Sequence, residues 1–567
     1  MKLDKEVLIG IFICGIILFG WDPFCRAMGW SSAPEKTVST ATAPVAPEKK
    51  QTVDSNVSKN AVQTDKKVAA QTEVVKELPA LPEVKLENDD VVYTIDQING
   101  CVKSIELKKY NNSKRDGKVI LDSSKESNQG AFAVFSNNST WKTLSVAYSA
   151  KSDDAKSFKL IRLVSSADFP QGIFIEQNWK LDGYMTDYSV KFSNNAKSHA
   201  KVGSATICGA LLAPWSLNSG DKVRIPSHRL DYLTSNGDFE DVKADAKDSK
   251  FFRNQPVVDW AGVSNKYFCS ILDSAEPFAM WQSRKYIKSG DDSLPAISVG
   301  AQIPAFELAP GEVKSFDFKA YNGPKIISLL DKYNPSTGKV MHLSWGPLDY
   351  LARLLLWVLI KFNEILHSYG WSIICLTIVV RLLFYPVTAK ANASMKKMQL
   401  VQPQLAALRE KYKDNPQLLN TKMMELYRQE GVNPFGGCLP ILLQIPVFFA
   451  LYATLEGAVE LRQVAFWWCK DLAAADTVAT IPLYFFDLPI NPLVLAMTLL
   501  MAIQQRMTPM SGDPMQKKMM MMMPGIMLIF LYDLPSGLTL YWTVSNLFSI
   551  IQLKLQQRAG KASAAAK

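Results

Sequence analysis

The chain has 567 residues, of which 48% are hydrophobic and 20% are charged, and its formal net charge is +10. These averages resemble those of a globular protein only because a soluble half and an apolar half offset each other, and local windows along the chain separate the two halves. The net charge is modest, and its distribution along the chain is more informative than its size.

The N-terminal segment predicts a membrane anchor followed by a flexible tether. Residues 1–30 contain a short charged start and an apolar core from Val7 to Trp21. A cleaved signal peptide and a retained anchor both fit this pattern, but no small-x-small cleavage site follows directly, which favours the anchor. Residues 31–85 have little aromatic content and cannot bury a core, so we expect a flexible linker there.

Residues 86–330 have the pattern of one large β-sandwich domain. Short β-type runs recur, and Asn99-Gly100 between two of them is typical of a hairpin turn. No helix–strand alternation is visible, which argues against a nucleotide-binding α/β domain. The cysteines of this region are Cys101, Cys208 and Cys269. They lack paired spacing, so we expect free or buried thiols with at most one bridge, and neither a metal site nor a catalytic constellation.

A linker and an amphipathic helix are expected over 331–368. Charged residues recur at spacings near 3.6 across 347–367, which fits an interfacial helix or a transmembrane span. Eight basic residues against four acidic ones between Pro386 and Gly431 place that loop in the cytoplasm by the positive-inside rule. With an N-in anchor, only one crossing can separate this loop from an outer β-domain. We therefore expect 347–367 to be an interfacial helix on the outer surface.

The remaining apolar segments predict a polytopic α-helical membrane protein with six spans. After the N-terminal anchor, the spans are expected at about 371–388, 434–456, 489–506, 519–533 and 538–556. The last two form a tight hairpin at Pro535-Ser536-Gly537. Both termini are then cytoplasmic, with a short tail at 559–567, and the outer segment 477–488 receives no role.

Arg381 is the most informative residue, because it lies inside the apolar run from Trp371 to Tyr385. A charge at mid-bilayer costs roughly 2.5–3.5 kcal/mol. At about 1.5 Å per residue, Arg381 is about 15 Å from Trp371 and too deep to reach the interface. The acids that flank the later spans all fall near the outer face, and these are Glu456, Glu460, Asp487 and Asp533. Arg381 therefore needs water, hydroxyls and carbonyls, or a partner that arrives from outside. A structural arginine held by backbone carbonyls is the alternative.

Polar residues at a similar depth predict a hydrated groove around Arg381. They are Thr377, Gln444, Thr498, Thr543, Ser545 and Asn546. Thr377 lies one helical turn before Arg381 on the same face. The alternative is that these side chains join the helices by hydrogen bonds of about 0.6–2 kcal/mol each. The lack of a carboxylate at that depth favours the groove.

The cytoplasmic segment 390–430 predicts two antiparallel helices. Its apolar residues recur three and four apart, and Asp414-Asn415-Pro416 supplies a cap and a first-turn proline between them. A basic, amphipathic hairpin could contact anionic lipid, ribosomal RNA or another protein. A solvated hairpin without such a role is equally compatible with the sequence.

Several stretches closely resemble the YidC membrane-protein insertases of bacteria. They are TIVVRLLFYP (377–386), VNPFGGCLPILLQIPVFFALY (432–452), VELRQ (459–463), DPMQ (513–516) and PSGLTLYWTVSN (535–546). The resemblance covers about 345–558 and implies a five-helix insertase core at 369–558. Residues 86–330 are similar, more weakly, to the periplasmic all-β supersandwich domain of the Gram-negative members.

The resemblance implies an insertase and chaperone of the bacterial inner membrane, which acts on nascent membrane proteins alone or with the Sec translocon. In that family the matching arginine lies in a hydrophilic groove and receives the polar, often acidic, segment of a substrate. Arg381, Thr377 and Gln444 fall in the matching motifs. Apolar positions along which substrates move correspond to Phe448, Phe530, Tyr541 and Trp542. The hairpin 390–430 is the expected contact for the ribosome or targeting factors.

The sequence also indicates what the chain does not do. It contains no phosphate-binding loop of Walker type, so we expect no hydrolysis, no cofactor and no small-molecule substrate, and the protein is not predicted to be an enzyme. The alternative function is a secondary transporter with a midplane charged site, against which the lack of a visible internal repeat argues. A periplasmic scaffold is a further alternative, although five additional spans are excessive for an anchor.

Overall fold

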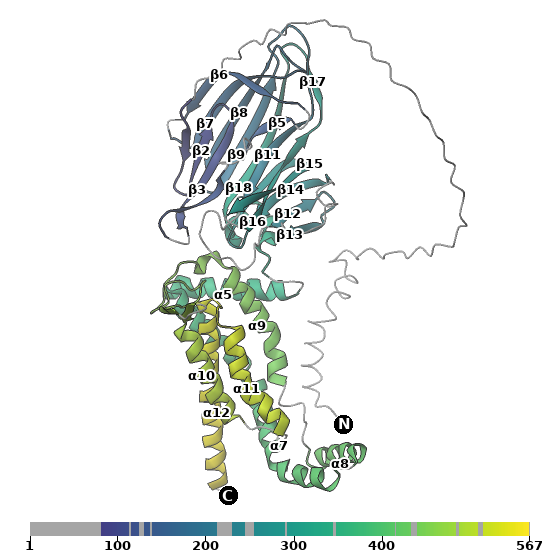
Figure 1. Cartoon of the computed structure of the whole chain (residues 1–567), viewed down its shortest axis with the longest axis vertical. Helices are drawn as coiled ribbons and strands as arrows, with labels where there is room; N and C mark the ends of the chain where they lie inside the picture. Colours follow the sequence, from purple (N-terminus) through teal and green to yellow (C-terminus); the bar gives the residue numbers. More distant parts are fainter. Residues whose placement is uncertain are drawn as a thin grey trace, which may run out of the picture.

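The computed structural model describes residues 81–112, 115–123, 130–136, 139–152, 154–212, 229–243, 255–289, 292–343, 347–413, 415–431, 439–482, 487–508 and 514–565. The predicted anchor at 1–30 and nearly all of the predicted linker at 31–85 lie outside these residues. The described chain forms a β-domain and a helical bundle. Between them, helix α5 (Pro347–Leu366) lies across the end of the bundle that faces the β-domain (Figure 1).

The β-domain is a sandwich-like arrangement of antiparallel sheets, as the sequence predicts. The small sheet has the order β1-β2-β3-β4, with β1 (Val84–Glu87), β2 (Val91–Asp96), β3 (Cys101–Asn111) and β4 (Lys118–Ser123). The large sheet has 12 strands, whose main path is β13-β12-β14-β15-β18-β9-β8-β7-β6, while β11 pairs with both β5 and β16.

The strands of the large sheet are β5 (Val134–Ser136), β6 (Lys142–Lys151), β7 (Ser157–Ser165), β8 (Ile173–Asp182), β9 (Met185–Ser193), β11 (Ala205–Leu212), β12 (Arg229–Thr234), β13 (Phe239–Lys243), β14 (Val257–Ser264), β15 (Phe268–Ser289), β16 (Asp292–Ile303) and β18 (Val313–Pro324). A separate antiparallel pair consists of β10 (Ala200–Val202) and β17 (Phe306–Leu308).

Alternation of apolar and polar residues explains the sandwich. In β8 every second residue from Ile173 to Leu181 is buried, and β2 shows the same alternation. The buried faces of both sheets belong to one hydrophobic core that includes Trp179. The hydroxyls of Tyr93 and Thr186 add a hydrogen bond of 2.8 Å between the small sheet and the large one.

The predicted hairpin turn at Asn99-Gly100 is confirmed. Strands β2 and β3 pair in antiparallel register, and the Gly100 N–H donates to the Asp96 carbonyl at 2.8 Å. Gly100 has a φ of 58°, and a Cβ there would collide with the side chains of Arg162 and Gln177. Backbone conformation and space therefore both require glycine.

The cysteines of the β-domain are buried thiols. Burial raises the pKa of Cys269 to about 12, so this side chain stays neutral at physiological pH. Its packing role is therefore that of a small apolar residue.

The segment that leads to α5 contains short helices where the sequence predicts a plain linker from residue 331. Helix α4 (Ile327–Tyr333) and the 3-10 helix η4 (Pro335–Met341) pack against the β-domain, with Leu330 and Val340 fully buried. The indole N–H of Trp260 donates to the Ser336 hydroxyl at 2.7 Å. Elements this short carry too few periodic residues for recognition from the sequence.

The helical bundle comprises α6 (Tyr369–Leu383), α7 (Tyr385–Lys411), α8 (Pro416–Gln429), α9 (Leu439–Gly457), η6 (Val459–Leu461), α10 (Pro492–Met507), α11 (Pro514–Phe530) and α12 (Ser536–Ala565). Among the described helices, none is by itself long and apolar enough to cross a membrane, whereas α6 and α7 meet that criterion together, bent by 59° at their junction. The segment expected as a span at about 371–388 is therefore divided between two helices, with the bend at Phe384.

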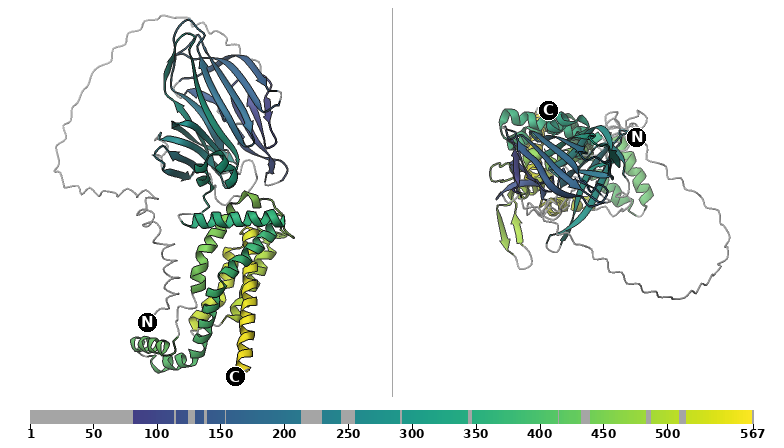
Figure 2. Two further views of the ribbon diagram at one scale, coloured as in Figure 1. Left: turned by 180° about the vertical axis from the view of Figure 1, so that it is seen from behind. Right: turned by 90° about the horizontal axis from the view of Figure 1, so that it is seen from above.

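Two further boundaries differ from the prediction. Helix α11 begins at Pro514 rather than near 519, and α12 continues to Ala565, so most of the predicted tail at 559–567 extends that helix. Alanine, lysine and glutamine are strong helix formers, which explains the extension. The unassigned segment 477–488 contributes to an antiparallel pair, β19 (Ala479–Pro482) and β20 (Asp487–Ile490), which projects from the bundle (Figure 2).

The β-domain and the bundle meet through polar contacts near α5. The Arg115 guanidinium donates to the Lys470 carbonyl at 2.7 Å, and the Gln463 side-chain amide donates to the Asn112 carbonyl at 2.6 Å. All four groups are outside the predicted spans, so these bonds can form on the outer side of the bundle.

Glu460 in η6 is a buried carboxyl at this junction. Neither of its side-chain oxygens has a hydrogen-bond partner within the described chain. Tyr110 of β3 and Tyr369 of α6 lie close enough for its charge to affect their titration. Burial raises the pKa of Glu460 to about 6 from an ordinary value of 4.5. The folded state therefore favours the protonated acid.

We expect the Glu460→Gln variant to be more stable than the wild type at pH 8 and nearly equal to it at pH 4. A raised carboxyl pKa stabilises the fold below the unfolded value of 4.5, and this contribution is lost as the pH rises through about 6. The wild type thereby loses roughly 2 kcal/mol of its free energy of unfolding once Glu460 is fully ionised. Thermal unfolding of the detergent-solubilised protein at both pH values measures it, with Glu410→Gln on the exposed face of α7 as the control. An equal difference at both pH values would contradict the expectation.

Candidate functional site

A break between α6 and α7 determines where Arg381 lies. Pro386 occupies the first turn of α7, lacks an N–H and is sterically incompatible with a helix that continues from the preceding turn. Helix α6 therefore ends at Leu383, and the chain turns by 59° through Phe384. Arg381 is thereby in the last turn of α6, where a cation gains about 0.3–1 kcal/mol from the helix dipole.

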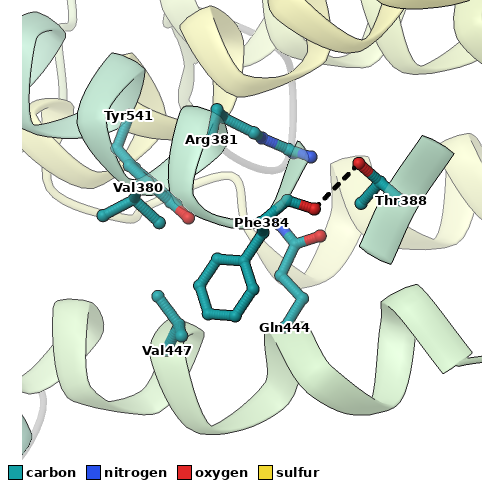
Figure 3. Close-up of a pocket in the computed structure, with 7 residues that line it drawn as sticks. All are labelled: Val380, Arg381, Phe384, Thr388, Gln444, Val447 and Tyr541. Carbon is teal, nitrogen blue, oxygen red and sulfur yellow. Dashed lines mark hydrogen bonds between the residues drawn. The ribbon is translucent and has the colours of Figure 1, made fainter. Parts of the chain in front are cut away.

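A narrow pocket lies beside Arg381 at this break. Helices α6, α7, α9 and α12 contribute to it, and Figure 3 shows the side chains that converge there. The lining residues are Val380, Arg381, Phe384, Thr388, Gln444, Val447 and Tyr541. The pocket thus combines one cation, an amide and two hydroxyl-bearing side chains with apolar walls.

The Arg381 side chain donates to a hydroxyl. Its Nε donates to Ser545 Oγ at 2.7 Å, and one terminal nitrogen donates to the same oxygen. Ser545 is fully buried, and the Tyr541 hydroxyl lies near the polar ends of Gln444 and Ser545. Across the described residues no carboxylate forms an ion pair with Arg381. The guanidinium therefore keeps donors available to a further acceptor.

The other hydroxyls predicted for the groove satisfy their own helices. Thr377 is fully buried and donates to the Ile373 carbonyl at 2.6 Å, and Thr543 donates to the Thr539 carbonyl at 2.7 Å. Thr498 donates in the same way to Val494 at 2.8 Å.

The side-chain amide of Asn546 donates to the Met497 carbonyl at 3.4 Å and so joins α12 to α10. Among the predicted groove residues, the structure thus brings together Arg381, Gln444 and Ser545.

The predicted apolar positions separate into two places. Phe448 packs against Trp542 with ring centroids 5.0 Å apart, which joins α9 to α12. Phe530 at the end of α11 is 75% exposed. Tyr541 is 2% exposed and belongs to the pocket instead.

Sequence reasoning missed several pocket residues, namely Val380, Phe384, Thr388 and Val447. Thr388 donates to the Phe384 carbonyl at 3.1 Å, which Figure 3 shows, and to the Tyr385 carbonyl at 3.0 Å. Its position seven residues after Arg381 was a usable signal, because that spacing returns to the same face of a helix.

The predicted helical hairpin at 390–430 is present as the second part of α7 followed by α8. Val401 and Leu405 are buried against Met423 and Leu426. The Asn415 side chain accepts from the Leu418 N–H at 3.1 Å and caps α8, and Pro416 is the first residue of that helix. The basic side chains of 390–430 are thus presented on an ordered hairpin.

Comparison with known proteins agrees with this architecture. A family model described as YidC periplasmic domain matches residues 83–358, and a model described as 60Kd inner membrane protein matches residues 361–563. A membrane protein insertase YidC of Cupriavidus necator is 30% identical over 589 residues, which cover 100% of this chain and 99% of that protein.

Two further matches either cover a smaller share of the chain or have a lower sequence identity. A membrane protein insertase YidC of Syntrophobacter fumaroxidans is 40% identical over 302 residues, so this chain matches about half the length of that relative, 53%. A solved structure titled "Active YidC insertase crystal structure with the first transmembrane domain resolved" is 19% identical and covers 84% of this chain and 93% of that chain, with a TM-score of 0.35. That score is too low to support an argument about the fold.

The β-domain and the helical region together define an inner-membrane protein with a periplasmic domain. The full-length relative makes the assignment specific. The chain belongs to the YidC family of membrane protein insertases, and it is not an enzyme.

Proposed function

We propose that this protein inserts nascent membrane proteins into the inner membrane, and that the pocket around Arg381 receives their polar segments. The observation that carries the proposal is a buried guanidinium that lines a pocket between four helices and whose partner is the neutral hydroxyl of Ser545. A cation within an apolar bundle is costly, so its retention without an acidic partner argues for a transient one.

The proposed topology has six spans with both termini in the cytoplasm. The basic α7–α8 hairpin supports a cytoplasmic position for residues 390–430. The position of α5 across the opposite end of the bundle supports its assignment as an interfacial helix on the periplasmic side (Figure 2). On this topology the Arg381 pocket lies in the cytoplasmic half of the bundle, because α7 continues from it to the cytoplasmic hairpin.

Charge pairing explains how the pocket selects its substrate. A carboxylate on the incoming segment is a stronger partner for a guanidinium than the neutral Ser545 hydroxyl, because both groups are charged. Gln444 and Thr388 line the same pocket and can hydrogen-bond neutral parts of the segment. The polar segment thus moves from water into the polar pocket in a first step, and crosses the rest of the membrane in a second.

Apolar surface provides the driving force for release into lipid. Phe449 on α9 is 50% exposed and packs against Phe448, which in turn contacts Trp542 of α12, while Phe530 at the end of α11 is 75% exposed. A substrate helix that moves along this surface gains roughly 25 cal/mol for each Å² of apolar area withdrawn from water. This process requires no nucleotide.

The proposed partners follow from the same layout. Nascent chains arrive at the cytoplasmic side, where the basic hairpin 390–430 can contact the ribosome, targeting factors or anionic lipid. Cooperation with the Sec translocon is part of the proposal.

Site-specific photocrosslinking tests the proposal. A photoreactive residue at Thr388 or Phe448 is expected to capture stalled nascent membrane proteins, whereas the same residue at Leu354, which is 55% exposed on α5, should capture far fewer. Capture at neither Thr388 nor Phe448, or equal capture at all three positions, would contradict the proposal. Solute flux across vesicles that contain the purified protein would instead support a secondary transporter.

A further inference from the structure

Three side-chain hydrogen bonds join the α6–α7 pair to α12, and we call them the polar seam. Their pairs are Arg381 with Ser545 at 2.7 Å, Thr388 with Gln552 at 3.1 Å, and Asn392 with Gln556 at 3.1 Å. In each pair the partners are 164 residues apart in the chain. A constant separation means that the helices run parallel in one register, on both sides of the break at Phe384.

The α12 side chains in the polar seam are longer where α7 is farther from α12. Helix α12 packs along α6, whereas α7 turns away from it, as both views show (Figures 1 and 2). Where the helices are close, the α12 residue is the short Ser545. Beyond the break the α12 residues are the long amides Gln552 and Gln556, which can reach across the wider gap.

Gln552 carries a polar amide in apolar surroundings and therefore needs a hydrogen-bond partner. It is 6% exposed and lies between Ile550 and Leu553, which are 6% and 7% exposed. A buried amide without a hydrogen bond is destabilising, so the bond from Gln552 Nε2 to Thr388 Oγ1 is strongly favoured. Thr388 also donates to the carbonyls of Phe384 and Tyr385, so Gln552 connects α12 directly to the break.

We propose that Gln552 and Gln556 are positioning residues for Arg381. Neither lines the pocket, but both hold α7 at a fixed angle to α12. That angle determines where Thr388 lies, and therefore how wide the pocket beside the guanidinium is. This inference rests on the proposed role of Arg381 in receiving acidic segments.

The test compares insertion of a substrate with an acidic polar segment by the wild type, Gln552→Leu, Arg381→Ala and the double variant. We expect about a fivefold loss from Gln552→Leu when Arg381 is present, and no further loss when Arg381 is already alanine. Gln557→Leu is the matched control, because Gln557 lies on α12 outside the seam and is exposed. It should insert the substrate at the wild-type rate.

Wild-type activity of Gln552→Leu, or the same fold-loss with and without Arg381, would overturn the positioning role while leaving the proposed function intact. An Arg381→Ala variant with wild-type insertion would overturn both the positioning role and the proposed function.

A second pair of residues guards against simple misfolding of the variants. Gln556→Leu should lose activity, and the exchange Asn392→Gln with Gln556→Asn should restore it to within about twofold, because the summed length of the two side chains is conserved. Failure of the exchange to restore activity would also overturn the role.

Discussion

Replacement of Arg381 by alanine is expected to slow the insertion of substrates with acidic polar segments by roughly tenfold to a hundredfold. A hydrogen bond to a charged group contributes about 1.5–3 kcal/mol, and each 1.4 kcal/mol is a factor of ten in rate or equilibrium. The alanine variant also leaves the buried Ser545 hydroxyl without the guanidinium that donates to it. Time-resolved insertion into vesicles that contain the purified protein measures the effect.

Two controls separate charge from packing in this experiment. Arg381→Lys should retain part of the activity, because a point charge suffices when no fixed bidentate partner is present. The same substrate with its Asp and Glu residues changed to Asn and Gln should depend little on Arg381. Equal insertion of every substrate by Arg381→Ala would contradict the assigned role.

Replacement of Trp179 by alanine should destabilise the β-domain by about 3–5 kcal/mol. Trp179 is fully buried in β8, stacks on Phe158 at 5.8 Å and packs against Tyr188 at 5.4 Å. Its indole nitrogen has no hydrogen-bond partner within the described residues, so the loss comes from packing alone. Protease resistance of the β-domain in the full-length protein, followed against urea concentration, reports the change.

Leu144→Ala on β6 is the matched control for this core substitution. Leu144 is 46% exposed, so its truncation should change stability by less than about 0.5 kcal/mol. A core side chain contributes at least roughly 1 kcal/mol to the free energy of unfolding. If the value for Trp179→Ala lies within about 1 kcal/mol of the wild-type value, the sandwich core is not organised around β8.

Periodicity and turn chemistry made the β-domain predictable. The alternation in β8 and the Asn99-Gly100 turn are local signals, and both appear in the structure as expected. The break at Phe384 was harder to recognise. Pro386 marks it, but the expected span of about 371–388 includes that proline, and hydropathy does not indicate where within a span a helix bends.

The candidate site was predictable only where the charge of a residue and its depth in an apolar segment restrict its possible partners. That Arg381 has no acidic neighbour followed from counting acids near each span, and the described residues agree. The sequence could not separate Ser545, which accepts from the guanidinium, from Thr543, which bonds its own helix. A hydroxyl on a helix makes that choice through its rotamer and its neighbours, which spacing does not encode.

Labelling of a cysteine in the pocket tests the central claim most directly. Gln444→Cys, in a chain whose eight native cysteines are replaced, keeps Arg381 and places a thiol in the pocket. We expect a membrane-impermeant maleimide to label it from the cytoplasmic side, and a stalled substrate with an acidic segment to protect it more than the matched neutral substrate does. A thiol that is unreactive from the cytoplasm, or equally protected by both substrates, would contradict a hydrated pocket that receives acidic segments at Arg381.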